Sequence, residues 1–173
     1  MVAALLDLPL GAGDHVAGAP GADLELVMYG DFQCPYCAAA QGPVRRVRER
    51  LGERLRFAFR HFPMPELHPD AERAAQAAEA AAAQGAFWPM HDALYASGGR
   101  LREGEILAAA DGLGLDSERV RAELRAGTHA QRVARDVESG RRSGVAGTPG
   151  FFANGRLVDG AFDAGSLIEA LTA

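Results

Sequence analysis

Two cysteines, Cys34 and Cys37, stand three positions apart in the stretch GDFQCPYCAAA, with Pro35 and Tyr36 between them. They are the only cysteines among 173 residues. At the start of a helix, unpaired N–H groups and the positive end of the helix dipole stabilise a thiolate, which is the nucleophilic form of cysteine. A second thiol one turn further on can displace whatever the first has captured. The spacing therefore predicts a reactive dithiol.

Two other interpretations of the pair stay open at this level. A passive disulfide would close a loop of only about four residues, for which the entropic stabilisation is small. A metal site would need Cys34 and Cys37 together with two of His61, His68 and His91, or an iron–sulfur cluster shared between two chains. No second paired motif at zinc-finger spacing is present, so the dithiol interpretation is preferred.

Composition excludes several classes of function. The net charge is -5, which does not favour a nucleic-acid groove or an anionic membrane surface as a partner. All 18 basic residues are arginine, so chemistry through a lysine Schiff base is excluded. No run approaches the roughly 20 apolar residues of a membrane span. We therefore expect neither a nucleic acid nor a membrane as partner.

The beginning of the chain bears on its location. The stretch MVAALLDLPLGAGDHVAG lacks a basic region, and Asp7 and Pro9 interrupt its short apolar segment, which is unlike a secretory signal. We therefore expect a cytoplasmic location, or an extracytoplasmic one if the chain has been trimmed. In a reducing cytoplasm, a lone pair of cysteines is not expected to serve as a structural staple.

The cysteines lie inside a predicted strand–helix–strand unit. Residues 23–32 are rich in branched and aromatic side chains and predict a buried strand, and residues 54–63 predict a second one. Between them, residues 34–52 predict a helix whose first turn accommodates Pro35. The helix is long enough for a crossover between parallel strands. A further short strand is possible within residues 4–10.

The middle and end of the chain have different characters. Residues 65–144 predict four or five helices and no strand, with Asp70 and Asp116 as helix caps. After Val145, the Asn154-Gly155 pair between two apolar segments predicts a β-hairpin. A final amphipathic helix follows, with Asp163 as its cap.

These elements predict an α/β fold in one domain over residues 1–173. The order is βαβ, then a helical insertion over about 65–144, then ββα.

Several segments together resemble the DsbA-like thiol–disulfide oxidoreductases of the thioredoxin superfamily, over most of the chain from about residue 14 onward. The segments that carry the resemblance are DHVAG (14–18), YGDFQCPYC (29–37), FRHFPM (59–64), HPDAERAAQAAEAA (68–81), QGAFWPMHDALY (84–95) and GVAGTPGFFANG (144–155). The resemblance implies a thioredoxin fold, and it implies exchange of a dithiol or disulfide with protein or peptide thiols. No bound cofactor is expected, because the two sulfurs carry the electrons.

The resemblance also implies roles for particular residues. Cys34 corresponds to the attacking, solvent-facing cysteine and Cys37 to the buried resolving one. Pro149 matches the cis-proline that faces the active pair in this family. Thr148 before it would leave backbone groups available to pair with an extended substrate chain.

One position departs from the family pattern. The central strand of these proteins usually carries a buried acid six positions before the first cysteine, where this chain has Met28. A buried carboxylate there would help take the proton from Cys37. The nearest acids are Glu25, on the opposite face of the strand, and Asp31 in the following loop. We expect Asp31 to cap the loop, with a role in proton relay as the alternative.

The CPYC motif is shared with glutaredoxins, so a glutathione-dependent enzyme, either glutaredoxin-like or a transferase, is the alternative function. Glutathione or a redox partner protein would then be the partner. Arg141 and Arg142, near the Thr148-Pro149 loop in sequence, give weak support for a glutathione site.

Simpler roles are expected for the other conspicuous side chains. We expect His61 to form hydrogen bonds at a strand end, and Trp88 and Tyr95 to belong to the core or to a groove. His15 and His129 have no partner nearby in sequence and are expected at the surface. Arginines 45, 46, 48 and 50 are expected on a solvated helix face.

Overall fold

The computed structural model describes residues 4–173, which form two compact units. The sheet unit comprises residues 4–30, 39–60 and 137–173, and the helical unit comprises residues 31–38 and 61–136. The helical unit overlaps the insertion expected over 65–144 and also takes in the cysteine segment. Among residues 4–173, none of the helices combines the length and apolar content needed to cross a membrane.

The strands form one five-stranded sheet in the order β1-β3-β2-β4-β5. The first strand, β1, pairs antiparallel with β3, and at its end Gly18 has a φ of +113°. A side chain there would collide with the Leu55 carbonyl, so glycine is required. The possible strand within residues 4–10 is reduced to one bridge between Leu5 and Arg156. The strands are β1 (His15–Gly18), β2 (Leu24–Gly30), β3 (Leu55–His61), β4 (Gly150–Ala153) and β5 (Arg156–Leu157).

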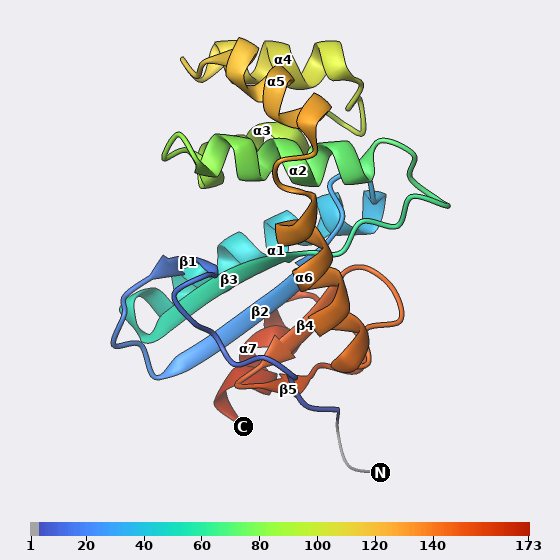
Figure 1. The fold of residues 1–173 in the computed structure, drawn as a ribbon. Coiled ribbons are helices and arrows are strands. Elements are labelled where there is room, and N and C mark those ends of the chain that lie inside the picture. Colours follow the sequence, from blue (N-terminus) through green and yellow to red (C-terminus); the bar gives the residue numbers. More distant parts are fainter. Residues whose placement is uncertain (1–3) are drawn as a thin grey trace. The chain divides into compact units, whose positions relative to one another are not determined.

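The predicted strand–helix–strand unit is confirmed. Strands β2 and β3 are neighbours that run in the same direction, joined by helix α1 (Pro35–Leu51) and the short 3-10 helix Gly52–Arg54 (Figure 1). Every residue of β2 is buried except Glu25. On α1, Val44 and Val47 are buried whereas the arginines expected on the solvated face are exposed. The helix therefore covers the sheet with a narrow apolar stripe.

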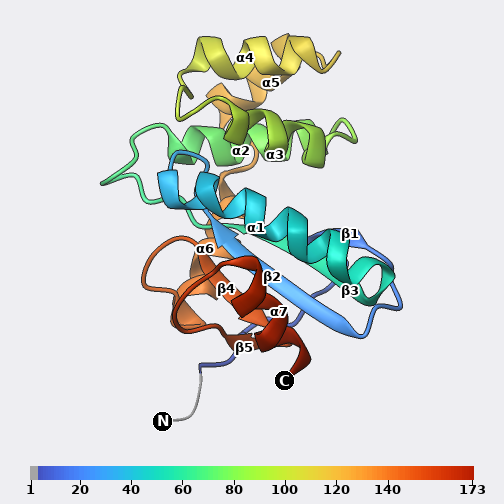
Figure 2. The same cartoon turned by 180° about the vertical axis from the view of Figure 1, so that it is seen from behind.

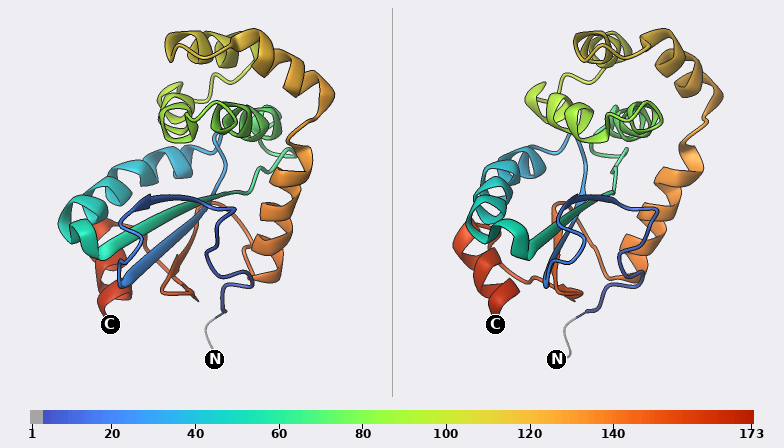
Figure 3. Two further views of the ribbon diagram at one scale, coloured as in Figure 1. Left: turned by 60° about the vertical axis from the view of Figure 1, so that its left-hand side comes forward. Right: turned by 90° about the vertical axis from the view of Figure 1, so that its left-hand side faces the viewer.

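The end of the chain forms the expected hairpin and helix. Asn154 and Gly155 both have positive φ, which is the conformation that a two-residue hairpin turn requires. Helix α7 (Ala164–Thr172) is capped by Asp163, whose Oδ1 accepts a hydrogen bond from Ser166 N (3.1 Å). Within the sheet unit, α7 and the later part of α1 lie on one face of the sheet and the later part of α6 on the other (Figure 3).

The insertion contains five helices, the upper of the two numbers expected. In the helical unit, α2 and α3 pack against each other, and so do α4 and α5 (Figure 2). Asp116 caps α5 as predicted, since its Oδ1 accepts from Arg119 N (3.0 Å). Asp70 does not cap α2, because its carboxylate binds the side chains of Arg73 and Gln33 instead. The helices are α2 (Ala71–Ala82), α3 (Phe87–Ala96), α4 (Glu103–Gly112), α5 (Ser117–Ala126) and α6 (Ala130–Arg142).

A buried arginine ties the first strand to the sheet unit. Arg60 on β3 donates from Nε to Asp14 Oδ1 (2.8 Å) and from Nη1 to the Tyr29 hydroxyl (2.9 Å). The Tyr29 hydroxyl shares a further hydrogen bond with Ser139 Oγ on α6 (2.7 Å). Burial opposes the charged form of Arg60, but the bonds to Asp14 and Tyr29 raise its guanidinium pKa above the usual value. The paired charge therefore stays in the interior.

We expect Asp14→Ala to lower the free energy of unfolding by about 3 kcal/mol, because it leaves the Arg60 charge buried without its partner. Urea denaturation measures the change. The matched control is Asp23→Ala, which breaks the exposed ion pair with Arg54 and should have little effect. Equal losses for the two variants would show that the buried pair is not special.

Candidate active site

The dithiol lies at the start of α1, as the sequence predicts. The Cys34 carbonyl accepts the hydrogen bond of Ala38 N (3.1 Å), which closes the first turn, and Pro35 occupies the first helical position. A proline there costs no hydrogen bond, because the first N–H groups of a helix have no partner within it. The two sulfurs are not joined in a disulfide in the structure. The Cys34 sulfur is therefore carried at the positive end of the helix.

The expectation of a solvent-facing Cys34 is wrong. Cys34 is only 3% exposed and Cys37 is fully buried, whereas Tyr36 between them is 67% exposed. The first turn of α1 brings both sulfur atoms close to the buried hydroxyl of Tyr95 and leaves Tyr36 on the outside. Electrostatics at the pair are consequently set by buried neighbours.

The Asp31 carboxylate binds several of the groups that surround the cysteines. It is fully buried and accepts four hydrogen bonds, two on each oxygen. Oδ1 accepts from the backbone N of Gln33 (2.7 Å) and of Cys34 (3.2 Å). Oδ2 accepts from Met64 N (3.0 Å) and pairs with His68 Nδ1 (2.8 Å). The loop-capping role expected for Asp31 is confirmed, and the same side chain also holds the loop before α2.

Gln33 makes a second attachment within the helical unit. Its Oε1 accepts from Asp70 N (2.8 Å), and its Nε2 donates to the Gly99 carbonyl (3.1 Å). Gln33 and Asp31 flank Phe32, whose ring packs against that of Tyr95 in a tilted arrangement with centroids 4.9 Å apart. Each of the three residues just before Cys34 is therefore attached to the rest of the helical unit, Asp31 and Gln33 by hydrogen bonds to its loops and Phe32 by ring packing on α3.

The pKa of Tyr95 on α3 is affected by its burial, by the cysteines and by Asp31. Burial, followed by the nearby Cys37, Asp31 and Cys34, raises the pKa of the Tyr95 phenol well above its usual value of 10. The hydroxyl therefore stays protonated at neutral pH and can donate a hydrogen bond toward Cys37. The core position expected for Tyr95 is confirmed, but a contact with the cysteines was not expected.

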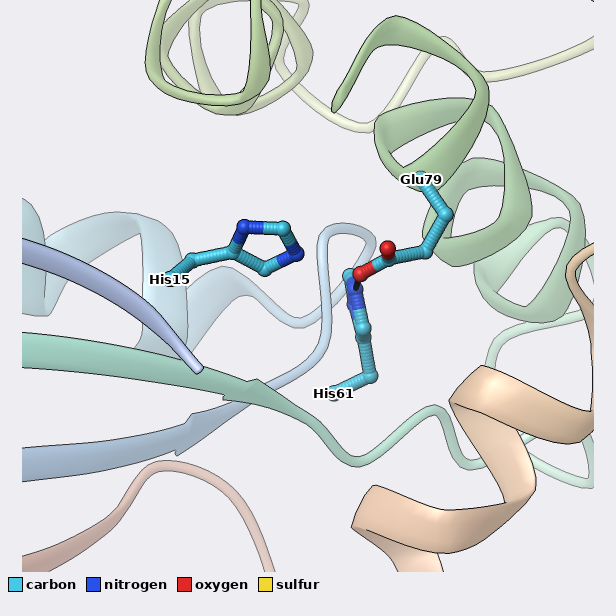
Figure 4. Close-up of side chains that lie close together, drawn as sticks. All are labelled: His15, His61 and Glu79. Atoms are coloured by element: carbon cyan, nitrogen blue, oxygen red, sulfur yellow. Dashed lines mark hydrogen bonds and ion pairs between the residues drawn. The ribbon is translucent and has the colours of Figure 1, made fainter. Parts of the chain in front are cut away.

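His61 lies at the end of β3 and forms hydrogen bonds, as predicted. Its Nε2 lies 2.7 Å from Glu79 Oε1, and Figure 4 shows the two side chains end to end. Its backbone N donates to Asp136 Oδ2 (3.0 Å). Within residues 4–173, no cluster of three or more candidate metal ligands includes Cys34 or Cys37. The geometry therefore gives no support to a metal site on the dithiol.

Met28 stands where the family usually has a buried acid, and the structure places its side chain in the interior. Met28 is fully buried, stands opposite Phe151 in the β2–β4 register, and its sulfur lies 3.9 Å from Gln41 Nε2. Glu25 is paired with Arg56 (2.7 Å) and is thereby engaged elsewhere on the strand. The carboxylate that contacts the Cys34 backbone is therefore that of Asp31.

Thr148 and Pro149 belong to the sheet unit. The peptide bond between them is cis. They directly precede β4, whose first residue, Gly150, stands opposite Tyr29 near the end of β2. Both residues are partly exposed. Their role in binding substrate stays a prediction.

Three groups of the site were not predicted from the sequence to lie beside the dithiol: the side chains of His68 and Gln33 and the hydroxyl of Tyr95. His68 is 37 positions from Asp31, and Asp70 is 37 positions from Gln33, so no local pattern joins them. The only signal was their presence in segments that resemble the family. His129 was also misjudged, because it pairs with Glu123 at 2.6 Å across the turn between α5 and α6.

Comparison with known proteins agrees with this geometry. The family described as Thioredoxin matches residues 11–173. A thioredoxin-like oxidoreductase from Silicibacter pomeroyi DSS-3 has a TM-score of 0.83 and 29% identity, covering 93% of this chain and 91% of that one. Oxidised BdbD from Bacillus subtilis has a TM-score of 0.87 at 20% identity, covering 98% and 97%, which shows the shared fold. The chain belongs to the thioredoxin family.

Longer relatives contain a similar segment. A protein named Na(+)/H(+) antiporter NhaA 1 from Salinispora arenicola is 45% identical over 159 residues, which is 92% of this chain and 24% of that protein. A protein of the same name from Mycobacterium sp. (strain KMS) is 40% identical over 164 residues, or 26% of its length. The chain thus spans about a quarter of the length of the curated relatives it matches.

The raised pKa of Tyr95 predicts a loss of stability in alkali. Because the folded pKa lies above the unfolded value of 10, the contribution of Tyr95 is complete below pH 10 and disappears as pH rises above it. We expect the free energy of unfolding to fall more between pH 8 and pH 10.5 in the wild type than in Tyr95→Phe. Urea titrations at the two pH values measure this. Tyr36→Phe, at an exposed position, should follow the wild type. Parallel losses in all three proteins would contradict the prediction.

Proposed function

We propose that the chain exchanges its Cys34–Cys37 dithiol or disulfide with thiols and disulfides of proteins or peptides. The observation that carries the proposal is the placement of both thiols in the first turn of α1, beside buried hydrogen-bonding groups. That placement favours a thiolate on Cys34 and keeps Cys37 within one helical turn of it. The membership of the chain in the thioredoxin family, and its similarity to a thioredoxin-like oxidoreductase, support the same reaction.

The reaction balances without a cofactor. In the reducing direction, the Cys34 thiolate attacks one sulfur of a substrate disulfide, that S–S bond breaks, and the departing thiolate takes up a proton. Cys37 then loses its proton and attacks Cys34, which forms the Cys34–Cys37 disulfide and releases the second substrate thiol. Two electrons pass from the dithiol to the substrate. Substrate oxidation is the same sequence in reverse.

Two single substitutions separate the roles of the cysteines. We expect Cys34→Ser to reduce turnover of a fluorescence-quenched peptide disulfide to the background rate, because the attacking sulfur is gone. Cys37→Ser should still attack but should stop as a persistent mixed disulfide between Cys34 and the peptide, detected by mass spectrometry. Sustained turnover by Cys37→Ser would contradict the assignment of the resolving thiol.

The same assay tests the glutathione alternative. We expect turnover with the peptide disulfide in the absence of glutathione, with a dithiol as reductant. Of the two arginines considered for a glutathione site, Arg142 donates to Glu138 (2.9 Å), and both are exposed. Turnover that requires glutathione would favour the glutaredoxin-like or transferase function.

Substrate pairing at Thr148 and Pro149 is part of the proposal. Their place directly before β4 supports the role that the family resemblance assigns to them. In the trapped mixed disulfide of Cys37→Ser, we expect amide hydrogen exchange at Thr148 to slow relative to the free protein, because an added strand takes up backbone hydrogen bonds. Unchanged exchange across residues 145–150 would place the substrate elsewhere.

A cytoplasmic location completes the proposal. Both cysteines belong to one reactive pair, a usage typical of reducing compartments, where structural disulfides are rare. Fractionation of cells that produce the protein, with trapping of thiols by a maleimide reagent, tests the location. Recovery of the protein outside the cytoplasm would contradict it.

A further inference from the structure

The Asp31–His68 pair is hydrogen-bonded to the backbone at the start of the dithiol. The pair lies within the helical unit, with His68 Nδ1 2.8 Å from Asp31 Oδ2. The other oxygen of the same carboxylate is bound by Cys34 N at 3.2 Å. Asp31 is therefore in direct contact with both the histidine and the backbone of the attacking cysteine.

The two members of the pair have opposite effects on Cys34. Asp31 is buried and contacts the backbone N of Cys34. When it is ionised, it disfavours a second negative charge on the Cys34 sulfur. A protonated His68 cancels that charge, whereas a neutral His68 leaves it in place. The His68 side chain is 19% exposed, so it can exchange its proton with water. Histidine ordinarily changes charge between pH 5 and 8.

Other ionisable groups lie around the pair. His61 and His91 contact the ring of Phe32, with centroids 6.0 and 5.7 Å from it, and the His91 ring is 5.1 Å from that of Tyr95. Cys34 and Cys37 approach from the first turn of α1, and Tyr95 approaches from α3 with its proton retained. Asp70, at the start of α2, is linked through Gln33 and is itself paired with Arg73 (2.8 Å). His68 is the histidine among them that is bonded to the Asp31 carboxylate, and histidine ordinarily changes charge near neutral pH.

We propose that His68, held by Asp31, is a positioning residue that favours the Cys34 thiolate when it is protonated and ceases to do so when it is neutral. This inference rests on the proposed function and adds a control of reactivity to it. It also assigns a role to an acid of the loop in a chain whose strand has Met28 at the family's acidic position.

The test measures the pH dependence of Cys34 alkylation in the Cys37→Ser background, where Cys34 is the only thiol. Rates with iodoacetamide from pH 3 to pH 9 give the midpoint at which the thiolate forms. We expect His68→Gln to move this midpoint upward by about half a unit to one unit, which corresponds to roughly threefold to tenfold less thiolate below it. Glutamine keeps an N–H donor for Asp31 but carries no charge.

Asp31→Asn supplies an independent test of the sign. It removes the negative charge, so the midpoint should move downward, opposite to the effect of His68→Gln. A merely structural role for the pair would not produce opposite shifts. The control is His129→Gln, which removes a histidine of similar exposure that is also paired with an acid, and its midpoint should match the parent protein. Circular dichroism establishes that each variant is folded.

The outcomes separate this inference from the proposed function. Opposite shifts in the two variants, with none in the control, support the role of His68. A reactive Cys34 whose midpoint is the same in the parent and in His68→Gln overturns that role and leaves the proposed function intact. A Cys34 that reacts as slowly as a thiol in an unstructured peptide at every pH overturns both. If His68→Gln does not fold, a midpoint that fails to fall in Asp31→Asn overturns the inference.

Discussion

The site depends on one buried carboxylate. Asp31 accepts hydrogen bonds from two residues of its own loop and from two residues of the loop before α2. A buried carboxylate is stable only where its charge is compensated, and these four donors supply the compensation. The arrangement fixes the segment that leads into the dithiol and also determines the charge close to it. The same carboxylate therefore sets the local structure of this segment and the charge beside the pair.

The two compact units have separate stabilising centres. In the sheet unit, the bond of Arg60 to Asp14 holds the first strand, and Tyr29 continues the network to α6. In the helical unit, the carboxylates of Asp31 and Glu79 are hydrogen-bonded to the imidazoles of His68 and His61. The cysteines belong to the helical unit, whereas Thr148 and Pro149 belong to the sheet unit. The residues proposed to react and those proposed to bind substrate thus depend on different sets of interactions.

Much of the fold could be predicted because its signals are local. Alternation and branched side chains marked β2 and β3, and Asn154-Gly155 marked the hairpin. Of the helix caps predicted from single aspartates, that of Asp116 is confirmed and that of Asp70 is wrong. Asp116 caps its helix, but Asp70 binds neighbouring side chains instead, because a carboxylate within reach of Arg73 and Gln33 has alternatives to backbone N–H groups. The first strand was missed because only four residues define it.

The sequence alone indicated the thioredoxin family and the candidate dithiol, since the spacing of Cys34 and Cys37 at a helix start follows from the chain itself. Tertiary structure decided the surroundings of that pair. The burial of Cys34, the approach of Tyr95 and the bond between Asp31 and His68 join residues far apart in sequence. Local periodicity cannot encode such contacts, because they arise only when separate elements pack together and bury their polar groups in pairs.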